Sequence, residues 1–233
     1  MLALPRRGLA AVAISLALSG VVAIAATSPA KANDGADESG FAWVRAAAPD
    51  MRDLVEQLHA GGFVIVVRHG ATFADEADTD PLNFDNIAAQ RNLNDQGKAL
   101  AKAFGEALHR AGIPVGKVYI SKYNRAYETA ALAGFSDIEK TIDLTEGGLV
   151  VSPRENNRRA EAFRKMLATA PQPGTNTILV THQLNIIAAL GKDWFEVKEG
   201  EALIFHPGNG GYAPVARVQM EEWPRLALAA KRP

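Results

Sequence analysis

The sequence predicts an α/β fold whose central sheet is mostly parallel and is covered by helices on both faces. Two observations support this fold class. The apolar, β-branched runs at residues 63–67 and 177–180 are typical of strands that are buried on both faces of a parallel sheet. Segments with helical periodicity lie between the predicted strands, and this alternation indicates βαβ units.

Helix and turn signals place the elements of the first half of the domain. Leu100, Phe104 and Leu108 recur at helical spacing, Asn94 is a candidate N-cap and Gly112 a stop signal. The expected elements are a short helix from Asp50 to Gly61, a strand at 63–67, a long polar loop at 70–92 and a helix at 94–112. Loops of that length in compact domains are usually functional.

The second half continues the alternation of strands and helices. Turn residues at 207–211 separate two short apolar runs, which predicts a β-hairpin near the end of the chain. The expected elements are a strand at 117–120, a helix at 125–132, a strand at 139–144, a helix at 154–168, a strand at 177–180, a helix at 183–190, and hairpin strands at 202–205 and 213–218.

Residues 1–32 have the pattern of an export signal. Arg6 and Arg7 form a basic start, residues 8–26 are almost wholly apolar, and Ala-Lys-Ala at 30–32 fits a cleavage site. We expect a cleaved signal peptide and a periplasmic protein. A retained membrane anchor is the alternative, because the apolar stretch is nearly as long as the roughly 20 residues of a spanning helix. The arginine pair also leaves both the general secretory route and twin-arginine export open.

Composition limits what the exported chain can be. We expect residues 33–49 to be a flexible leader and residues 50–233 to form one domain. Without residues 1–32, which hold two Arg, one Lys and no acids, the formal net charge changes from −1 to −4. That balance disfavours nucleic-acid binding. The absence of cysteine excludes disulfides, thiol nucleophiles and thiolate metal sites.

Basic and imidazole side chains follow three of the predicted strands. Arg68 and His69 directly follow the predicted strand at 63–67, and His182 follows the predicted strand at 177–180. Arg125 comes shortly after the strand at 117–120. The carboxyl ends of parallel strands share one edge of a sheet, so these four side chains should converge there. Two planar guanidiniums and two imidazoles suit a tetrahedral dianion, which predicts a phosphoryl ligand.

His69 is the candidate nucleophile of this group. Neighbouring cations should lower its pKa, and a neutral imidazole can attack phosphorus. Arg68, Arg125 and a donating His182 would then stabilise the charge of the transferred phosphoryl group. The remaining histidines are expected to be exposed or structural: His59, His109 and His206.

Four segments together resemble the histidine phosphatase superfamily, also called phosphoglycerate mutase-like. They are Arg68-His69-Gly70-Ala71-Thr72, Leu93-Asn94-Asp95-Gln96-Gly97, Ser121-Lys122-Tyr123-Asn124-Arg125-Ala126-Tyr127-Glu128-Thr129-Ala130, and Val180-Thr181-His182. The resemblance implies a phosphoglycerate mutase-like three-layer α/β/α sandwich and a phosphohistidine on His69. It implies a phosphate pocket of Arg68, Arg125 and His182, with Thr72 and Gln183 also binding substrate. It implies no metal and no cofactor.

The general acid is the point at which branches of the superfamily differ. In one branch of the superfamily an acidic residue follows the third strand, and Glu146 lies in a comparable place. In another branch an Asp follows the second histidine, where this chain has Gln183, whose neutral amide cannot donate a proton usefully. Glu146 is therefore our candidate acid. The acids of the long loop are the alternatives: Asp75, Glu76 and Asp78.

The expected function is a phosphatase that hydrolyses a small-molecule or glycolipid phosphomonoester. A phosphomutase is an alternative of the same chemistry, although export separates the chain from cytoplasmic metabolites. A phosphoanion-binding or regulatory module without turnover is an alternative of a different class. No nucleic-acid partner is expected, and membrane contact is expected only through an uncleaved signal segment. The sequence selects no particular ester and no oligomeric state.

Overall fold

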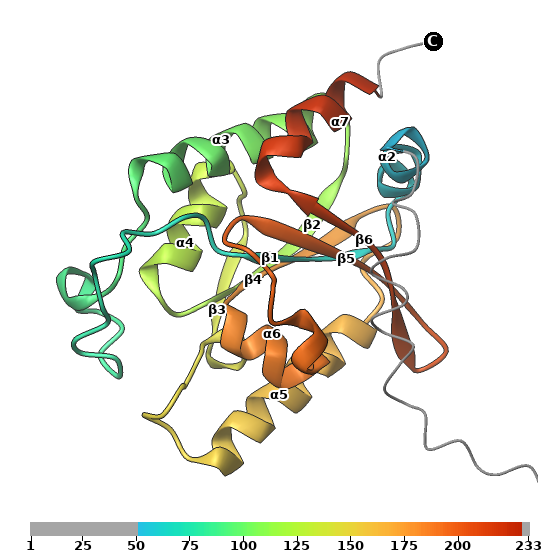
Figure 1. Cartoon of the computed structure of the whole chain (residues 1–233). Coiled ribbons are helices and arrows are strands. Elements are labelled where there is room, and N and C mark those ends of the chain that lie inside the picture. The colour runs from blue at the N-terminus through green and yellow to red at the C-terminus, as the bar shows by residue number, and fades with distance from the viewer. Residues whose placement is uncertain (1–50, 230–233) are drawn as a thin grey trace, which may run out of the picture. The chain divides into compact units, whose positions relative to one another are not determined.

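The computed structural model describes residues 51–229. In this range a six-stranded sheet carries helices on both faces (Figure 1). The predicted signal peptide at 1–32, the leader at 33–49 and Asp50 lie outside the described residues. None of the helices within 51–229 is both long and apolar enough to cross a membrane.

The central sheet has the strand order β3-β2-β4-β1-β5-β6. Its strands are β1 (Val64–Arg68), β2 (Val115–Ser121), β3 (Ile138–Thr141), β4 (Asn176–Thr181), β5 (Glu201–Gly208) and β6 (Gly211–Gln219). The β1–β4, β4–β2 and β2–β3 pairs are parallel. The β1–β5 and β5–β6 pairs are antiparallel.

The predicted α/β class is confirmed, but the sheet is mixed where the sequence predicted a mostly parallel one. The predicted hairpin does form, as β5 and β6, and it joins the sheet beside β1. The reason lies at the start of β5. Gly200 N donates to Arg68 O at 3.0 Å and to His69 O at 2.8 Å, so the chain enters β5 beside the end of β1 and must run back along it.

Helices cover the two faces of the sheet in two groups. Figure 1 shows α2 (Met51–Ala60), α3 (Asp95–Arg110), α4 (Asn124–Leu132) and α7 (Trp223–Ala229) on one face, with α5 (Pro153–Ala168) and α6 (Gln183–Leu190) on the other. Single 3₁₀ turns link them: η1 (Ile87–Ala89), η2 (Ile142–Leu144), η3 (Lys192–Trp194) and η4 (Met220–Glu222). Sequence patterns did not predict α7.

Side-chain caps explain where two of the helices begin. The Asn94 side chain accepts a hydrogen bond from Gly97 N, which satisfies a free N–H in the first turn of α3. Ser152 does the same for α5 by accepting from Glu155 N, and Pro153 occupies the first helical position, where no donor is needed. These caps fix the start of α3 next to the segment that follows β1.

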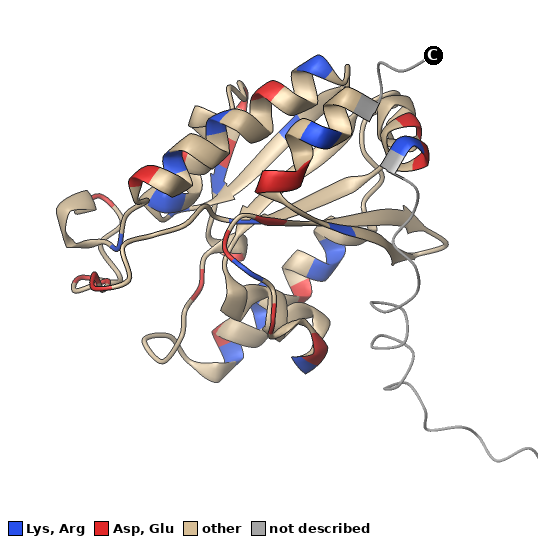
Figure 2. Cartoon of the chain, turned by 45° about the horizontal axis from the view of Figure 1, so that its top comes forward, with Lys and Arg blue, Asp and Glu red and all other residues tan. Residues whose placement is uncertain are grey.

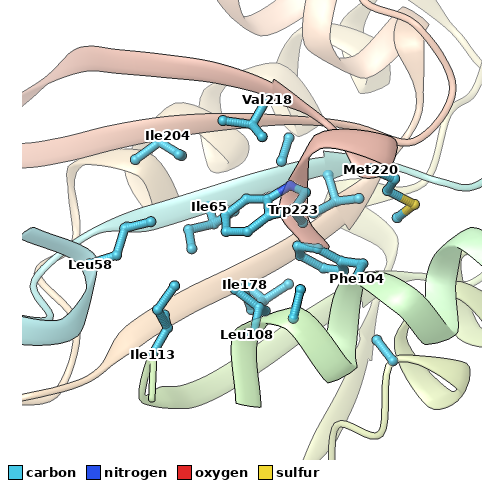
Figure 3. Packing of buried hydrophobic residues seen from close by; sticks show 14 of the residues in the cluster. Leu58, Ile65, Phe104, Leu108, Ile113, Ile178, Ile204, Val218, Met220 and Trp223 are labelled. Atoms are coloured by element: carbon cyan, nitrogen blue, oxygen red, sulfur yellow. The ribbon is translucent and has the colours of Figure 1, made fainter. Parts of the chain in front are cut away.

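The two helical layers have separate hydrophobic cores, and β1 contributes to both. Ile65 and Val67 belong to the core under α2, α3, α4 and α7, whereas Val64 and Val66 belong to the core under α5 and α6. Alternate side chains of one strand therefore anchor opposite layers. In the first core Trp223 packs edge-on against Phe104, with ring centroids 5.0 Å apart (Figure 3).

Charged residues of both signs are mixed on the helices that cover the sheet. Figure 2 shows Lys and Arg interspersed with Asp and Glu along these helices. Several form exposed ion pairs within one helix, such as Lys165 with Glu161 at 2.9 Å. Exposed pairs of this kind contribute little stability each, because both partners remain in water. The fold therefore depends on its two apolar cores.

Candidate active site

The carboxyl end of β1 places Arg68 and His69 at the edge of the sheet. His69 N donates to Thr181 O of β4 at 3.1 Å, so the two neighbouring strand ends are joined at this point. The turn after His69 packs against the first turn of α3. A Cβ on Gly97 would lie 2.1 Å from Ala71 O, so only glycine permits this approach. The nucleophile candidate thus rests on a rigid part of the fold.

The His69 imidazole has a defined tautomer and is buried, with 1% of its surface exposed. Nδ1 lies 2.9 Å from Gly70 O. A carbonyl oxygen only accepts, so Nδ1 carries the proton and Nε2 keeps its free electron pair. Burial, followed by the nearby Arg125 charge, holds the pKa of His69 well below its usual range. The ring is therefore neutral at pH 7.

His182 lies at the N-terminus of α6, with its ring centroid 5.1 Å from that of His69. Its Nε2 is 2.6 Å from Ser121 Oγ, and Arg125 Nε donates to its Nδ1 at 3.3 Å. Burial and then the Arg125 charge also hold the pKa of His182 well below its usual range. In this arrangement Nδ1 accepts a hydrogen bond from Arg125 and Nε2 donates one to Ser121 Oγ. For Nδ1 to donate to a bound anion, the ring must adopt the other tautomer, with its proton on Nδ1.

Ser121 can hydrogen-bond to either tautomer of His182. Its Oγ lies 3.3 Å from Thr145 Oγ1 and accepts from Tyr123 N at 3.2 Å. Thr145 Oγ1 donates a hydrogen bond to Thr141 O at 2.9 Å, so the same oxygen can accept a hydrogen bond from Ser121 Oγ. Ser121 Oγ can therefore donate its hydrogen bond either to Thr145 Oγ1 or to His182 Nε2. When Ser121 donates to Nε2, Nδ1 of His182 carries the proton and faces the site as a donor.

Arg125 is fully buried in the first turn of α4 and holds two carboxylates. Its Nη1 and Nη2 contact the two oxygens of Asp78 at 2.9 and 3.1 Å, which is a bidentate pair. Nη2 also donates to Glu146 Oε1 at 2.6 Å. The guanidinium lies 4.1 Å from the centre of the Tyr123 ring, which fixes its plane.

Arg68 and Thr72 share a partner that the sequence did not indicate, Glu199. Arg68 Nη1 donates to Val197 O at 2.6 Å, and its Nη2 lies 3.6 Å from Glu199 Oε1. Thr72 Oγ1 donates to the same oxygen at 2.8 Å. Arg91 approaches it at 3.9 Å. Within the described part of the chain, Arg68 Nε is buried and has no hydrogen-bond partner, so one donor of this guanidinium is free.

The structure brings together most of the residues that the sequence selected. Arg68, His69, Arg125, Glu146 and His182 form one cluster, which we call the phosphate cage. Thr72 lies at its border through Glu199, as described above. The Gln183 side chain, in contrast, donates to Phe195 O, which leaves its role in substrate binding a prediction.

The three alternative acids of the long loop lie in different places. Only Asp78 contacts the phosphate cage, through Arg125. Asp75 and Glu76 are exposed, and Glu76 accepts a hydrogen bond from Asn92 N at 2.9 Å. Of the four candidate acids, the structure therefore leaves Glu146, which belongs to the cage, and Asp78, which contacts it through Arg125.

Sequence analysis did not assign a definite role to four residues that contact the site: Ser121, Asp78, Arg91 and Glu199. Ser121 ends β2, so the rule that functional groups follow parallel strands could have found it. Asp78 was one of three acids on a loop without periodicity. Arg91 and Glu199 reach the site only because their loops fold back onto it, for which local sequence gives no signal. Among residues 51–229 no group of three His, Asp or Glu side chains is arranged to hold a metal ion.

The low pKa of both site histidines predicts a loss of stability in mild acid. An unfolded histidine binds a proton as the pH falls through about 6.5, whereas the buried neutral rings do not. The unfolded state therefore gains protons first, and the free energy of unfolding falls as the pH drops below 7. Urea titrations between pH 7 and pH 5 should show this slope in the wild type. A variant with both His69→Asn and His182→Asn should have a flatter slope, and an unchanged slope would contradict the assignment.

A comparison with known protein families matches part of the chain. The sequence model of the histidine phosphatase superfamily (branch 1) matches residues 64–151, a segment that contains His69, Arg125 and Glu146. No curated protein matches the sequence.

Solved structures of phosphatases are similar to this chain at low sequence identity. A complex of the protein histidine phosphatase SixA with tungstate has 16% identity and a TM-score of 0.47, covering 69% of this chain and 98% of that one. A structure described as a putative alpha-ribazole-5'-P phosphatase from Escherichia coli has 17% identity and a TM-score of 0.49, with the same coverage. An Entamoeba histolytica phosphoserine phosphatase mutant, bound to phosphoserine, has 12% identity and a TM-score of 0.48, covering 68% and 98%.

Proposed function

Because this chain belongs to the histidine phosphatase superfamily, we propose that it is a phosphatase that hydrolyses a phosphomonoester through a phosphohistidine on His69. The state of this side chain gives the strongest support. Gly70 O holds the proton on Nδ1, burial and nearby arginines keep the ring neutral, and Nε2 keeps the free electron pair of a nucleophile.

In the first step, His69 Nε2 attacks phosphorus, a P–N bond forms and the P–O bond to the alcohol breaks. Arg68 and Arg125 offset the charge on the three oxygens of the transferred group. The buried Arg68 Nε supports this role, because it is a donor without a partner among the described residues. His182 contributes a third donor in the tautomer that carries its proton on Nδ1, in which Nε2 accepts a hydrogen bond from Ser121 Oγ.

Arg125 must exchange its partners for the substrate to bind. Asp78 and Glu146 occupy both of its terminal nitrogens, so an incoming phosphoryl group replaces at least one of these carboxylates. A carboxyl group that stays beside the bound dianion favours its protonated form, because like charges repel. That proton is available for the leaving oxygen.

We propose Glu146 as the acid that supplies it. Its Oε1 lies 2.6 Å from Arg125 Nη2 and 3.5 Å from His182 Nδ1, so it lies between two groups of the phosphate cage. The Glu146 carboxyl protonates the alcohol as it leaves. In the second step the carboxylate takes a proton from water, water oxygen attacks phosphorus, and the P–N bond breaks to release inorganic phosphate and free His69.

A comparison of leaving groups tests the acid. Glu146→Gln should lower kcat for an alkyl phosphate by about 10²-fold or more, because an alkoxide leaves poorly without a proton. The same variant should lose much less activity on 4-nitrophenyl phosphate, whose leaving group needs no proton. Asp78→Asn is the matched control, since it also removes one carboxylate from Arg125. A selective loss in Asp78→Asn instead would overturn the assignment of Glu146.

The activity is tested with a panel of phosphomonoesters in the presence of water alone and then of added alcohols. A phosphatase releases inorganic phosphate in proportion to the alcohol formed. A phosphomutase would instead transfer the group to a second hydroxyl. If inorganic phosphate binds but none of the esters is turned over, the chain is a phosphoanion-binding module and the proposed hydrolysis is wrong.

We also propose that the protein acts in the periplasm, on the pattern of residues 1–32. N-terminal sequencing of protein recovered from the periplasmic fraction should begin near Asn33. Recovery of the full chain in the membrane fraction would instead favour the retained anchor.

A further inference from the structure

A cavity of about 370 Å³ lies among α5, α6 and the segment that follows Glu146. Its lining is largely apolar, with Leu149, Ala160, Leu184 and Ala188 among its walls. Small-molecule sites in proteins commonly have volumes of about 300 to 1,000 Å³ and walls of this character. The cavity is thus large enough for one ring or a short alkyl chain.

Two residues in the wall of this cavity neighbour cage residues along the chain. Gly147, in its wall, directly follows Glu146, and Leu184 comes two residues after His182. Both neighbouring side chains belong to the cage, because Glu146 Oε1 lies 3.5 Å from His182 Nδ1. The cavity wall thus begins at Gly147 and Leu184, one and two residues from two members of the cage, and we infer that the remainder of an ester bound in the cage extends toward it.

Most of the exposed large hydrophobic side chains in the described range lie on a few connecting segments. Of nine large hydrophobic side chains that are exposed in the described range, seven lie on the loop at 70–92, the segment after Glu146, the first turn of α6 or the turn after η3. They are Phe73, Leu82, Ile87, Leu149, Val150, Leu184 and Phe195. Two of them, Leu149 and Leu184, line this cavity, and exposed apolar groups beside a concave site are typical of a binding surface.

One buried polar atom in the cavity wall lacks a partner. Asn185 is 6% exposed, and its Nδ2 makes a long contact of 3.4 Å with Asp143 O. Its Oδ1 accepts no hydrogen bond from the described residues. A flipped amide would direct oxygen at the Asp143 carbonyl, so the present orientation is the better one. Buried polar atoms are rarely left unpaired without a functional reason.

We propose that this cavity binds the alcohol portion of the substrate, and that the substrate is therefore a phosphomonoester of an apolar alcohol with an aryl or alkyl group. The proposal rests on the proposed phosphatase function and adds the substrate class. Sugar phosphates fit it less well, because most of their hydroxyls would meet the apolar walls formed by Leu149, Leu184 and Ala188, although Asn185 Oδ1 offers a free acceptor. The cage supplies phosphate recognition and the cavity supplies selectivity for the alcohol.

A series of n-alkyl phosphates from methyl to hexyl tests the proposal at constant leaving-group chemistry. Each buried CH₂ should lower KM about threefold to fourfold until the cavity is full. Ala188→Gln places a longer polar side chain in the wall from an exposed helix position, so it should abolish most of this dependence and leave methyl phosphate turnover unchanged. Ala99→Gln, at an exposed position of α3, is the matched control.

The same series of n-alkyl phosphonates separates this proposal from the phosphatase function, because phosphonates bind without being hydrolysed. Tighter binding of hexyl- than of methylphosphonate by calorimetry supports the cavity even if the protein turns over no ester. Equal affinities across the series, or a full chain-length dependence in Ala188→Gln, would overturn the cavity assignment. Turnover that favours glycerol 3-phosphate over hexyl phosphate would overturn it while the proposed hydrolysis stands.

Discussion

Replacing His69 by Asn should lower kcat/KM for phosphomonoester hydrolysis by about 10³-fold or more while the protein remains folded. The side chain amide of Asn can still donate to Gly70 O, but it offers no nucleophilic electron pair at the position of Nε2. Steady-state assays with 4-nitrophenyl phosphate measure the loss. His109→Asn is the control, because His109 is exposed at the end of α3.

This variant also distinguishes chemistry from binding. The phosphate cage retains Arg68, Arg125 and His182, so inorganic phosphate should bind His69→Asn with an affinity close to that of the wild type. Near-normal hydrolysis by the variant would mean that another group attacks phosphorus, and the account of His69 as nucleophile would then be wrong.

Replacing Arg125 by Met should have the second largest effect, on both activity and stability. We expect kcat/KM to fall by about 10² to 10³-fold, because the transferred phosphoryl group loses a bidentate partner. Asp78 and Glu146 would also lose their shared cation. Since Arg125 is fully buried, we expect the free energy of unfolding to fall by about 3 kcal/mol. Urea denaturation and phosphate release measure the two effects.

Two further variants show whether burial and geometry cause these losses. Arg158→Met is the matched control, because Arg158 also holds two carboxylates, Asp143 and Glu155, but on an exposed helix face. It should leave activity unchanged and cost much less stability. Arg125→Lys keeps the charge but not the planar fork, so it should recover more stability than activity. Equal losses for the two Met variants would contradict this explanation.

The strand ends of the parallel part of the sheet were predictable from sequence for a topological reason. Apolar runs identified β1 and β4, and parallel neighbours must end at the same edge. Arg68, His69 and His182 were therefore expected at one edge of the sheet, and the pairing of β1 with β4 places them side by side. The structure adds the hydrogen bond from His69 N to Thr181 O that joins the two ends.

Other parts of the site depend on contacts that local sequence does not encode. The direction of β5 follows from Gly200, which binds the carbonyl groups at the end of β1, and this makes the sheet mixed. The same turn brings Glu199 to Arg68 and Thr72. Asp78 could not be separated from Asp75 and Glu76, because only tertiary packing of the long loop turns it toward Arg125.

Trapping the phosphoenzyme tests the central claim most directly. Wild-type protein is mixed with a rapidly hydrolysed phosphomonoester, stopped in alkali to preserve the acid-labile P–N bond, digested, and analysed by mass spectrometry. We predict one phosphoryl group on His69 during turnover and none in His69→Asn. Turnover without a phosphorylated His69, or a phosphoryl group trapped on a different residue, would contradict the account.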